Sequence, residues 1–93
     1  MKVALRVAAI ADLDNIHTFI AQDSPRNANK VVSRVWAVIN NLILPFPEIG
    51  RVGRVPGTRE LPVRGLPYLI IYEPDEARNT VTILNVLHTA RDR

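Results

Sequence analysis

The side chains that could carry out chemistry in this sequence are arginine, tyrosine and histidine. They gather in the second half of the chain, at Arg59, Arg64, Tyr68, His88 and Arg91. A metal-free ribonuclease uses such groups: a base takes the proton of the 2′-hydroxyl, an acid protonates the leaving oxygen, and arginines stabilise the charge of the phosphorane. The same side chains are also common on half-buried sheets, where they pack or are solvated. Residue chemistry by itself favours this structural interpretation.

Other kinds of chemistry find little support. His17 and His88 are the only histidines, and they lack the close spacing of a chelating pair. The glycines of "GRVGRVPG" are not followed by the Gly-Lys-Ser/Thr of a phosphate loop. Ser24 stands directly before a proline, so it suits a helix cap better than a nucleophile. We therefore expect no metal, no cofactor and no acyl-transfer triad.

Length and composition predict a single domain over residues 1–93, of which 47% are hydrophobic. The absence of cysteine favours the cytoplasm. No stretch approaches about 18 apolar residues, and no signal peptide is expected, so we predict no membrane association. A formal net charge of +3 favours an acidic protein or nucleic acid as a partner without choosing between them.

The elements that position these residues follow from periodicity. Residues 3–7 alternate apolar side chains with Ala4 and Arg6, which predicts a strand. Residues 8–22 change to a helical repeat, whose apolar members are Ile10, Leu13, Ile16 and Ile20. Asp12 and Asp14 lie on different sides of this helix, and we expect both to be solvated.

A second helix should follow over about residues 25–44. Ser24 can cap it, Pro25 suits its first position, and the "LPFP" segment ends it. Its core-facing side chains are expected to be Ala28, Val31, Val35, Val38 and Leu42.

Three strands should form the rest of the chain, over residues 58–63, 68–73 and 80–87. Short segments rich in turn formers separate them, which predicts consecutive antiparallel pairing. The fold class is therefore α+β, with two layers in the order β-α-α-β-β-β. A helical hairpin should pack on one face of an antiparallel sheet.

Apolar side chains exceed what one such core needs. Val32, Trp36 and Ile43 lie beside the core-facing residues of the second helix. Leu84 and Val86 alternate with apolar neighbours, so both faces of the last strand carry aliphatic side chains. Such a surplus indicates a surface for a protein partner, although packing within the chain is the simpler alternative.

Four segments in this order resemble the RelE/ParE superfamily of toxin–antitoxin toxins. They are "AAIADLDNIHTFIA", "SPRNANKVVSRVWAVINNL", "FPEIGRVGRVPGTRELPVRGLPYLIIYEP" and "VTILNVLHTAR", and together they cover nearly the whole chain. The most specific pieces are "GTREL", "PYLIIY" and "VLHTAR", which look most like the ParE branch. The resemblance implies the same two-layer β-α-α-β-β-β fold, with the first strand beside the last.

The ParE resemblance also implies a function and partners. It implies a toxin that binds DNA gyrase, stalls it on cleaved DNA and is neutralised by a ParD-like antitoxin encoded next door. Contact with DNA would be indirect, through that antitoxin. We assign antitoxin binding to Val32, Trp36, Ile43, Leu84 and Val86. We assign target binding to Arg51, Arg54, His88 and Arg91.

A ribosome-dependent endoribonuclease of the RelE type is the alternative, with Arg59, His88 and Arg91 as its catalytic candidates. In RelE-like nucleases the third strand usually carries an arginine that contacts the scissile phosphate, whereas this chain has Tyr68 there. A phenol cannot replace the fixed charge of a guanidinium. We therefore expect no catalytic residues, and we keep an inactive or retargeted toxin as the third interpretation.

Overall fold

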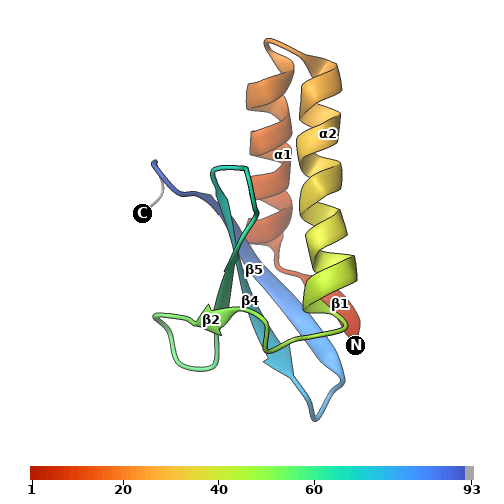
Figure 1. Ribbon diagram of the computed structural model, residues 1–93, viewed down its shortest axis with the longest axis vertical. Helices are drawn as coiled ribbons and strands as arrows, with labels where there is room; N and C mark the ends of the chain where they lie inside the picture. The colour runs from red at the N-terminus through yellow and green to blue at the C-terminus, as the bar shows by residue number, and fades with distance from the viewer. Residues whose placement is uncertain (92–93) are drawn as a thin grey trace.

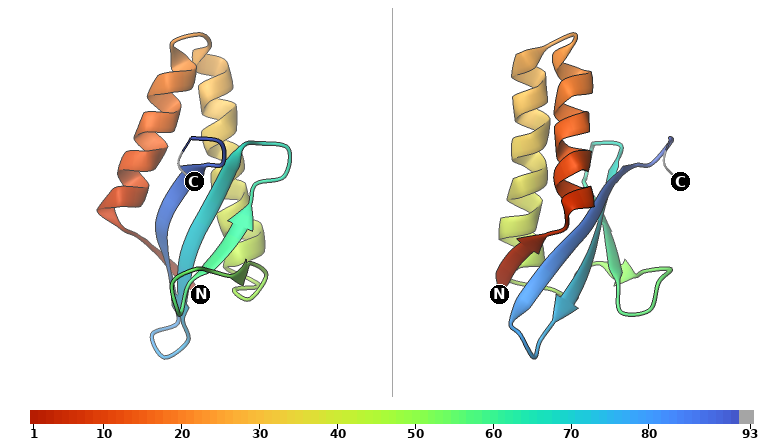
Figure 2. Two further views of the ribbon diagram at one scale, coloured as in Figure 1. Left: turned by 90° about the vertical axis from the view of Figure 1, so that its left-hand side faces the viewer. Right: turned by 180° about the vertical axis from the view of Figure 1, so that it is seen from behind.

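The chain folds into two layers, with a helical hairpin covering one face of a sheet (Figures 1 and 2). The computed structural model describes residues 1–91. Its elements are β1 (Lys2–Leu5), α1 (Val7–Ala21), α2 (Pro25–Val38), the π-helical turn η1 (Ile39–Ile43), β2 (Arg51–Val52), β3 (Arg59–Pro62), β4 (Tyr68–Asp75) and β5 (Thr80–His88). The predicted α+β architecture is confirmed.

The sheet has five strands in the order β1-β5-β4-β3-β2. The three predicted strands pair consecutively and antiparallel, as expected. β1 lies beside β5 and runs parallel to it, so the sheet is mostly rather than wholly antiparallel. The two-residue strand β2, which extends the sheet beyond β3, was not predicted because it is too short to show an alternation.

The first strand ends earlier than the sequence pattern suggests. β1 stops at Leu5, and α1 begins at Val7, whose side chain is exposed. Arg6 keeps an extended backbone, and its N–H donates to the carbonyl of Ile83 at 3.0 Å. The alternation of apolar side chains in the sequence therefore includes Val7, although the chain has already left the sheet at that residue.

The second helix begins and extends as predicted, but its last turn changes register. The hydroxyl of Ser24 accepts the N–H of Asn27 at 3.1 Å, which confirms the cap. In η1 the N–H of Leu44 donates to the carbonyl of Ile39 at 2.9 Å, a π-type bond that spans five residues. The wider turn rotates the final residues about the helix axis.

This rotation exchanges two side chains relative to the prediction. Leu42, expected in the core, is 40% exposed, whereas Ile43, expected on the surface, is fully buried. Both expectations were wrong for one reason, because they assumed α-helical spacing up to residue 44.

A bulge in the last strand changes which side chains of β5 face the core. Ile71 pairs with Asn85, but Tyr72 pairs with Ile83, so Leu84 is the extra residue. Val86 therefore joins Ile83 in the core on the helical side and is only 2% exposed. The prediction that Val86 lies on a free surface was wrong.

Asp12 of α1 braces this bulge rather than facing solvent. Its Oδ2 accepts the backbone N–H of Val86 at 2.9 Å and the side-chain amide of Asn85 at 3.1 Å. The expectation of a solvated group was wrong for Asp12, while Asp14 is exposed as predicted. No helix within the described residues is long and apolar enough to cross a membrane.

Candidate functional site

A groove on the helical hairpin brings together two of the three surface residues predicted on the second helix. Val32 and Trp36, one turn apart, line a hollow of about 260 Å³. The opposite wall comes from α1, and the other lining residues are Leu5, Ile10, Leu13, Asp14 and His17. Ile10 is 49% exposed, so a large apolar side chain stands open at this groove. We call it the hairpin groove.

Trp36 has two roles in this groove. It is partly buried and packs against the core, yet it also lines the open hollow. His17 Nε2 and the side-chain oxygen of Asn29 lie 2.8 Å apart and join the two helices. The groove is therefore a surface of fixed shape, with an indole as its largest side chain.

The other three residues assigned to antitoxin binding lie elsewhere. Ile43 and Val86 are core residues, so neither can form a surface strip. Leu84 is partly exposed at the bulge of β5 and does not line the hairpin groove. Of the five assigned residues, the structure therefore brings together only Val32 and Trp36.

The basic residues assigned to target binding fall into two separate regions. Arg51 and Arg54 are exposed in and after β2, beside the buried carboxylate of Glu60. Arg51 forms an ion pair with Glu60 at 3.3 Å, and the backbone N–H of Arg54 donates to the same carboxylate at 3.4 Å. Glu60 thus holds this loop in place while the two guanidinium groups remain near solvent.

His88 and Arg91 form the second region, at the end of β5. The His88 ring meets Tyr68 edge to face, with centroids 5.6 Å apart. Its Nδ1 accepts the backbone N–H groups of Ala90 and Arg91, both at 3.2 Å. The guanidinium of Arg91 lies 4.9 Å from the ring centroid of Phe19 on α1, a cation–π contact.

The nuclease candidates do not converge. Arg59 pairs with Tyr72, while His88 pairs with Tyr68, four residues away along β4. This separation corresponds to about 13 Å along the strand. Groups acting on one scissile phosphate must all reach it within hydrogen-bonding distance. Arg59 and His88 therefore do not form a common site in this structure.

Arg59 instead holds the loop that precedes β2. Its Nη1 donates to the carbonyls of Gly50 at 2.8 Å and Glu48 at 3.2 Å. The Tyr72 hydroxyl accepts the N–H of Gly50 at 2.9 Å and donates to the carbonyl of Pro47 at 2.8 Å. The Arg59 contacts span nine and eleven positions and the Tyr72 contacts span 22 and 25, so no local sequence pattern reveals them.

The Tyr72 phenol makes its contacts with Pro47 and Gly50 dependent on pH. Burial raises the pKa of Tyr72 above its ordinary value of 10.0, and the Gly50 N–H and the Arg59 charge offset only part of that effect. The folded state retains this proton to higher pH than the unfolded state. The contribution of the phenol to the free energy of unfolding is therefore complete below pH 10 and is lost as pH rises through the folded pKa.

Replacing Tyr72 with phenylalanine should therefore have two effects. At neutral pH the free energy of unfolding should fall by about 1–3 kcal/mol, because Gly50 and Pro47 lose their buried partner. Above pH 10 the difference between wild type and variant should shrink, which urea titrations at several pH values would measure. A difference that stays constant up to pH 12 would contradict this role of the phenol.

Metal chemistry has no visible site in the described part of the chain. Residues 1–91 contain no group of three or more histidine, cysteine, aspartate or glutamate side chains that could hold an ion.

Sequence reasoning missed Ile10 as part of the hairpin groove, because its helical spacing marked it as core. It also missed Phe19, whose contact with Arg91 depends on how the chain continues after β5.

Comparison with known proteins agrees with this fold. Residues 3–93 match the family model described as "ParE toxin of type II toxin-antitoxin system, parDE". A protein of Sinorhizobium fredii (strain NBRC 101917 / NGR234) named "Putative toxin Y4kP" is 34% identical over 87 residues, which are 94% of this chain and 86% of the relative.

Two solved structures share the fold. One, described as a chromosomal ParDE TA system from P. aeruginosa, superimposes with a TM-score of 0.76 at 23% identity and covers 95% of both chains. The isolated E. coli RelE toxin gives a TM-score of 0.72 at 14% identity, covering 97% of this chain and 85% of its own. Since the family model spans almost the entire sequence, the chain belongs to the ParE toxin family of type II toxin–antitoxin systems.

Proposed function

We propose that this toxin acts on DNA gyrase in the cytoplasm, is not a ribonuclease, and is neutralised by a ParD-like antitoxin. The observation that carries the choice of target is the environment of Tyr68. Its side chain is only 4% exposed and packs in the core against His88. The resemblance to the RelE/ParE superfamily implies that RelE-like nucleases place a phosphate-binding arginine at this strand position.

A buried phenol at this position supplies no positive charge to a phosphate. Transition-state stabilisation in phosphoryl chemistry depends on fixed charges at the reacting group. Arg59 does not compensate, since it holds backbone carbonyls and lies about 13 Å along the strand from the position of His88. Arg91 lies beside His88, but its guanidinium is placed over the ring of Phe19. A toxin that acts only by binding its target does not require such a charge cluster.

The hairpin groove supports the proposal of an antitoxin partner. Its open apolar side chains, Ile10, Val32 and Trp36, lie on two helices that hold each other through His17 and Asn29. An amphipathic segment that folds on binding inserts apolar anchors into such a groove. We therefore place part of the antitoxin in the hairpin groove and exclude Ile43 and Val86 from the contact.

Two basic regions remain as candidates for contact with gyrase. Arg51 and Arg54 form one region, and His88 and Arg91 form the other. Because the first region lies in and after the edge strand β2 and the second lies at the end of β5, substitutions in each region can be tested separately.

Expression of the toxin without its antitoxin tests the proposal in cells. Stalled gyrase leaves broken DNA, so induction should produce a DNA-damage response and filamentous cells. Growth arrest with intact chromosomes and codon-dependent messenger cleavage would overturn the proposal.

A further inference from the structure

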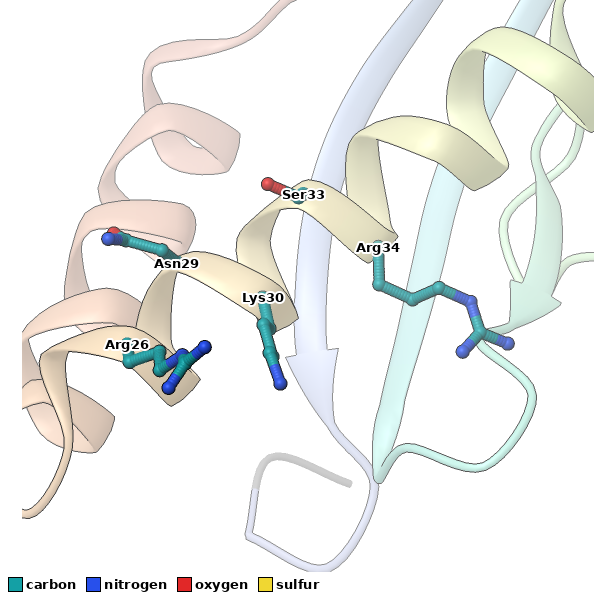
Figure 3. A pocket seen from close by; sticks show the side chains of 5 residues that line it. All are labelled: Arg26, Asn29, Lys30, Ser33 and Arg34. Carbon is teal, nitrogen blue, oxygen red and sulfur yellow. The ribbon is translucent and has the colours of Figure 1, made fainter.

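A row of basic side chains on α2 lies outside both the hairpin groove and the two basic regions proposed to contact gyrase. Arg26, Lys30 and Arg34 are exposed and follow one another at intervals of four residues. This spacing places them on one side of the helix, over about 12 Å at a rise of about 1.5 Å per residue. Figure 3 shows them in this row, with Arg34 reaching toward the turn between β3 and β4. We call these three residues the basic stripe.

The positive charge of the basic stripe is not balanced within the described residues 1–91. Neither ion pair of this part of the chain involves the stripe, since these pairs join Arg51 with Glu60 and Arg78 with Asp75. Arg34 Nη2 donates to the backbone carbonyl of Arg64 at 2.9 Å, which positions the guanidinium without neutralising it. The hollow along the stripe has only Asn29 and Ser33 as its other lining residues.

The composition of this hollow indicates what it can bind. An acidic peptide that folds on binding needs apolar anchor sites, and no apolar residue lines this hollow. Single-stranded nucleic acid needs aromatic platforms for its bases, and these are also absent from its lining residues. Arginine, lysine, asparagine and serine are the side chains that contact phosphate oxygens of a duplex.

The dimensions agree with a duplex as well. Double-stranded DNA carries one negative charge per about 1.7 Å of its axis, so a stripe of about 12 Å faces several phosphates at once. Double-stranded RNA carries phosphates as well, but double-stranded RNA-binding domains also contact its 2′-hydroxyl groups across two successive minor grooves, over about 16 base pairs. These considerations favour duplex DNA.

We propose that the basic stripe binds the phosphate backbone of duplex DNA directly and without sequence preference. This contact goes beyond the antitoxin-mediated one implied by the family resemblance, and it does not depend on gyrase being the target. Val32 and Trp36 lie about 200° around the helix from Lys30 and Arg34, so the hairpin groove and the basic stripe face different directions.

Fluorescence anisotropy of the free toxin with a labelled 20-base-pair DNA duplex tests this inference. With three phosphate contacts, the logarithm of the binding constant should fall against the logarithm of salt concentration with a slope of about −2.7. The variant carrying Arg26→Gln, Lys30→Gln and Arg34→Gln should bind at least tenfold more weakly, with a slope near zero. Arg26→Gln alone should reduce the slope by about 1.

A matched control separates the effect of losing the basic stripe from the effect of lowering the net charge. Lys2→Gln, Arg6→Gln and Arg78→Gln also take the formal charge from +3 to 0, since each triple change removes three positive groups, and all three positions are exposed elsewhere. This control should keep the wild-type slope. Glutamine is a good helix former, and circular dichroism would verify that both variants are folded.

Three outcomes would overturn the inference. They are equal losses in the two triple variants, absence of duplex binding by the wild type at low salt, and tighter binding of an RNA duplex or a polyglutamate peptide than of DNA. Retained affinity of the stripe variant for antitoxin, together with lost DNA affinity, would support it.

Discussion

Replacing Ile43 with alanine is expected to lower the free energy of unfolding by about 2–5 kcal/mol. Ile43 is fully buried at the end of the π-helical turn, so truncation removes apolar contacts and leaves a cavity. In a domain of this size, 1 kcal/mol corresponds to about 4–8 °C in Tm, so the loss should exceed about 8 °C. Thermal and urea unfolding followed by circular dichroism would measure it.

Leu42→Ala is the matched control for this prediction. Leu42 is the residue next to Ile43, and its replacement with alanine removes an aliphatic side chain of the same size. Leu42 is 40% exposed. Its replacement should cost about 1–1.5 kcal/mol, less than that of Ile43, since only part of its side chain leaves water on folding. The reverse order of the two effects would show that α2 continues as a regular α-helix and that the π turn is absent.

Replacing Trp36 with alanine is expected to weaken antitoxin binding by about 30-fold or more. An indole that anchors an interface contributes about 2–4 kcal/mol on truncation, and each 1.4 kcal/mol is about a factor of ten. Trp36 is the largest side chain of the hairpin groove. Titration calorimetry with the proposed ParD-like antitoxin would give the affinity.

The control for Trp36→Ala must account for its contact with the core, which will also lower the stability of the free toxin. Binding should therefore be measured at a temperature where the variant is fully folded. Phe46→Ala removes an exposed aromatic side chain outside the groove and should leave the affinity unchanged. Unchanged affinity of a folded Trp36→Ala variant would place the antitoxin elsewhere.

The helices and the longer strands of this fold were predictable because each carries a local signal. The cap at Ser24, the proline after it and the helical repeat defined α2 within a few residues. Alternation and turn formers located β3, β4 and β5, and their consecutive pairing followed. Such patterns depend on hydrogen bonds and burial between residues close in sequence.

Two local irregularities were not predictable, and they account for the errors at the site. The π turn at Ile39–Ile43 and the bulge at Leu84 each change the register by one residue. Apolar residues occur on both sides of each irregularity, so the sequence accommodates either register. The choice depends on distant contacts, such as Asp12 accepting the N–H of Val86.

The site was therefore predicted only in part. Val32 and Trp36 meet in one groove because their spacing lies within a regular part of α2. The structural role of Arg59 could not be read from its neighbours, because its partners are backbone carbonyls of a separate loop.

Whether this toxin acts on gyrase or on messenger RNA is tested by comparing two activities of one preparation of antitoxin-free toxin. Purified toxin is added to gyrase with relaxed plasmid, and in parallel to translating ribosomes with a defined messenger. We predict loss of supercoiling or accumulation of cleaved plasmid, with the messenger intact. Codon-dependent cleavage of the messenger with gyrase unaffected would contradict the account and make Arg59, His88 and Arg91 catalytic candidates again. Inactivity in both assays, from a preparation that still binds antitoxin, would contradict it in favour of an inactive or retargeted toxin.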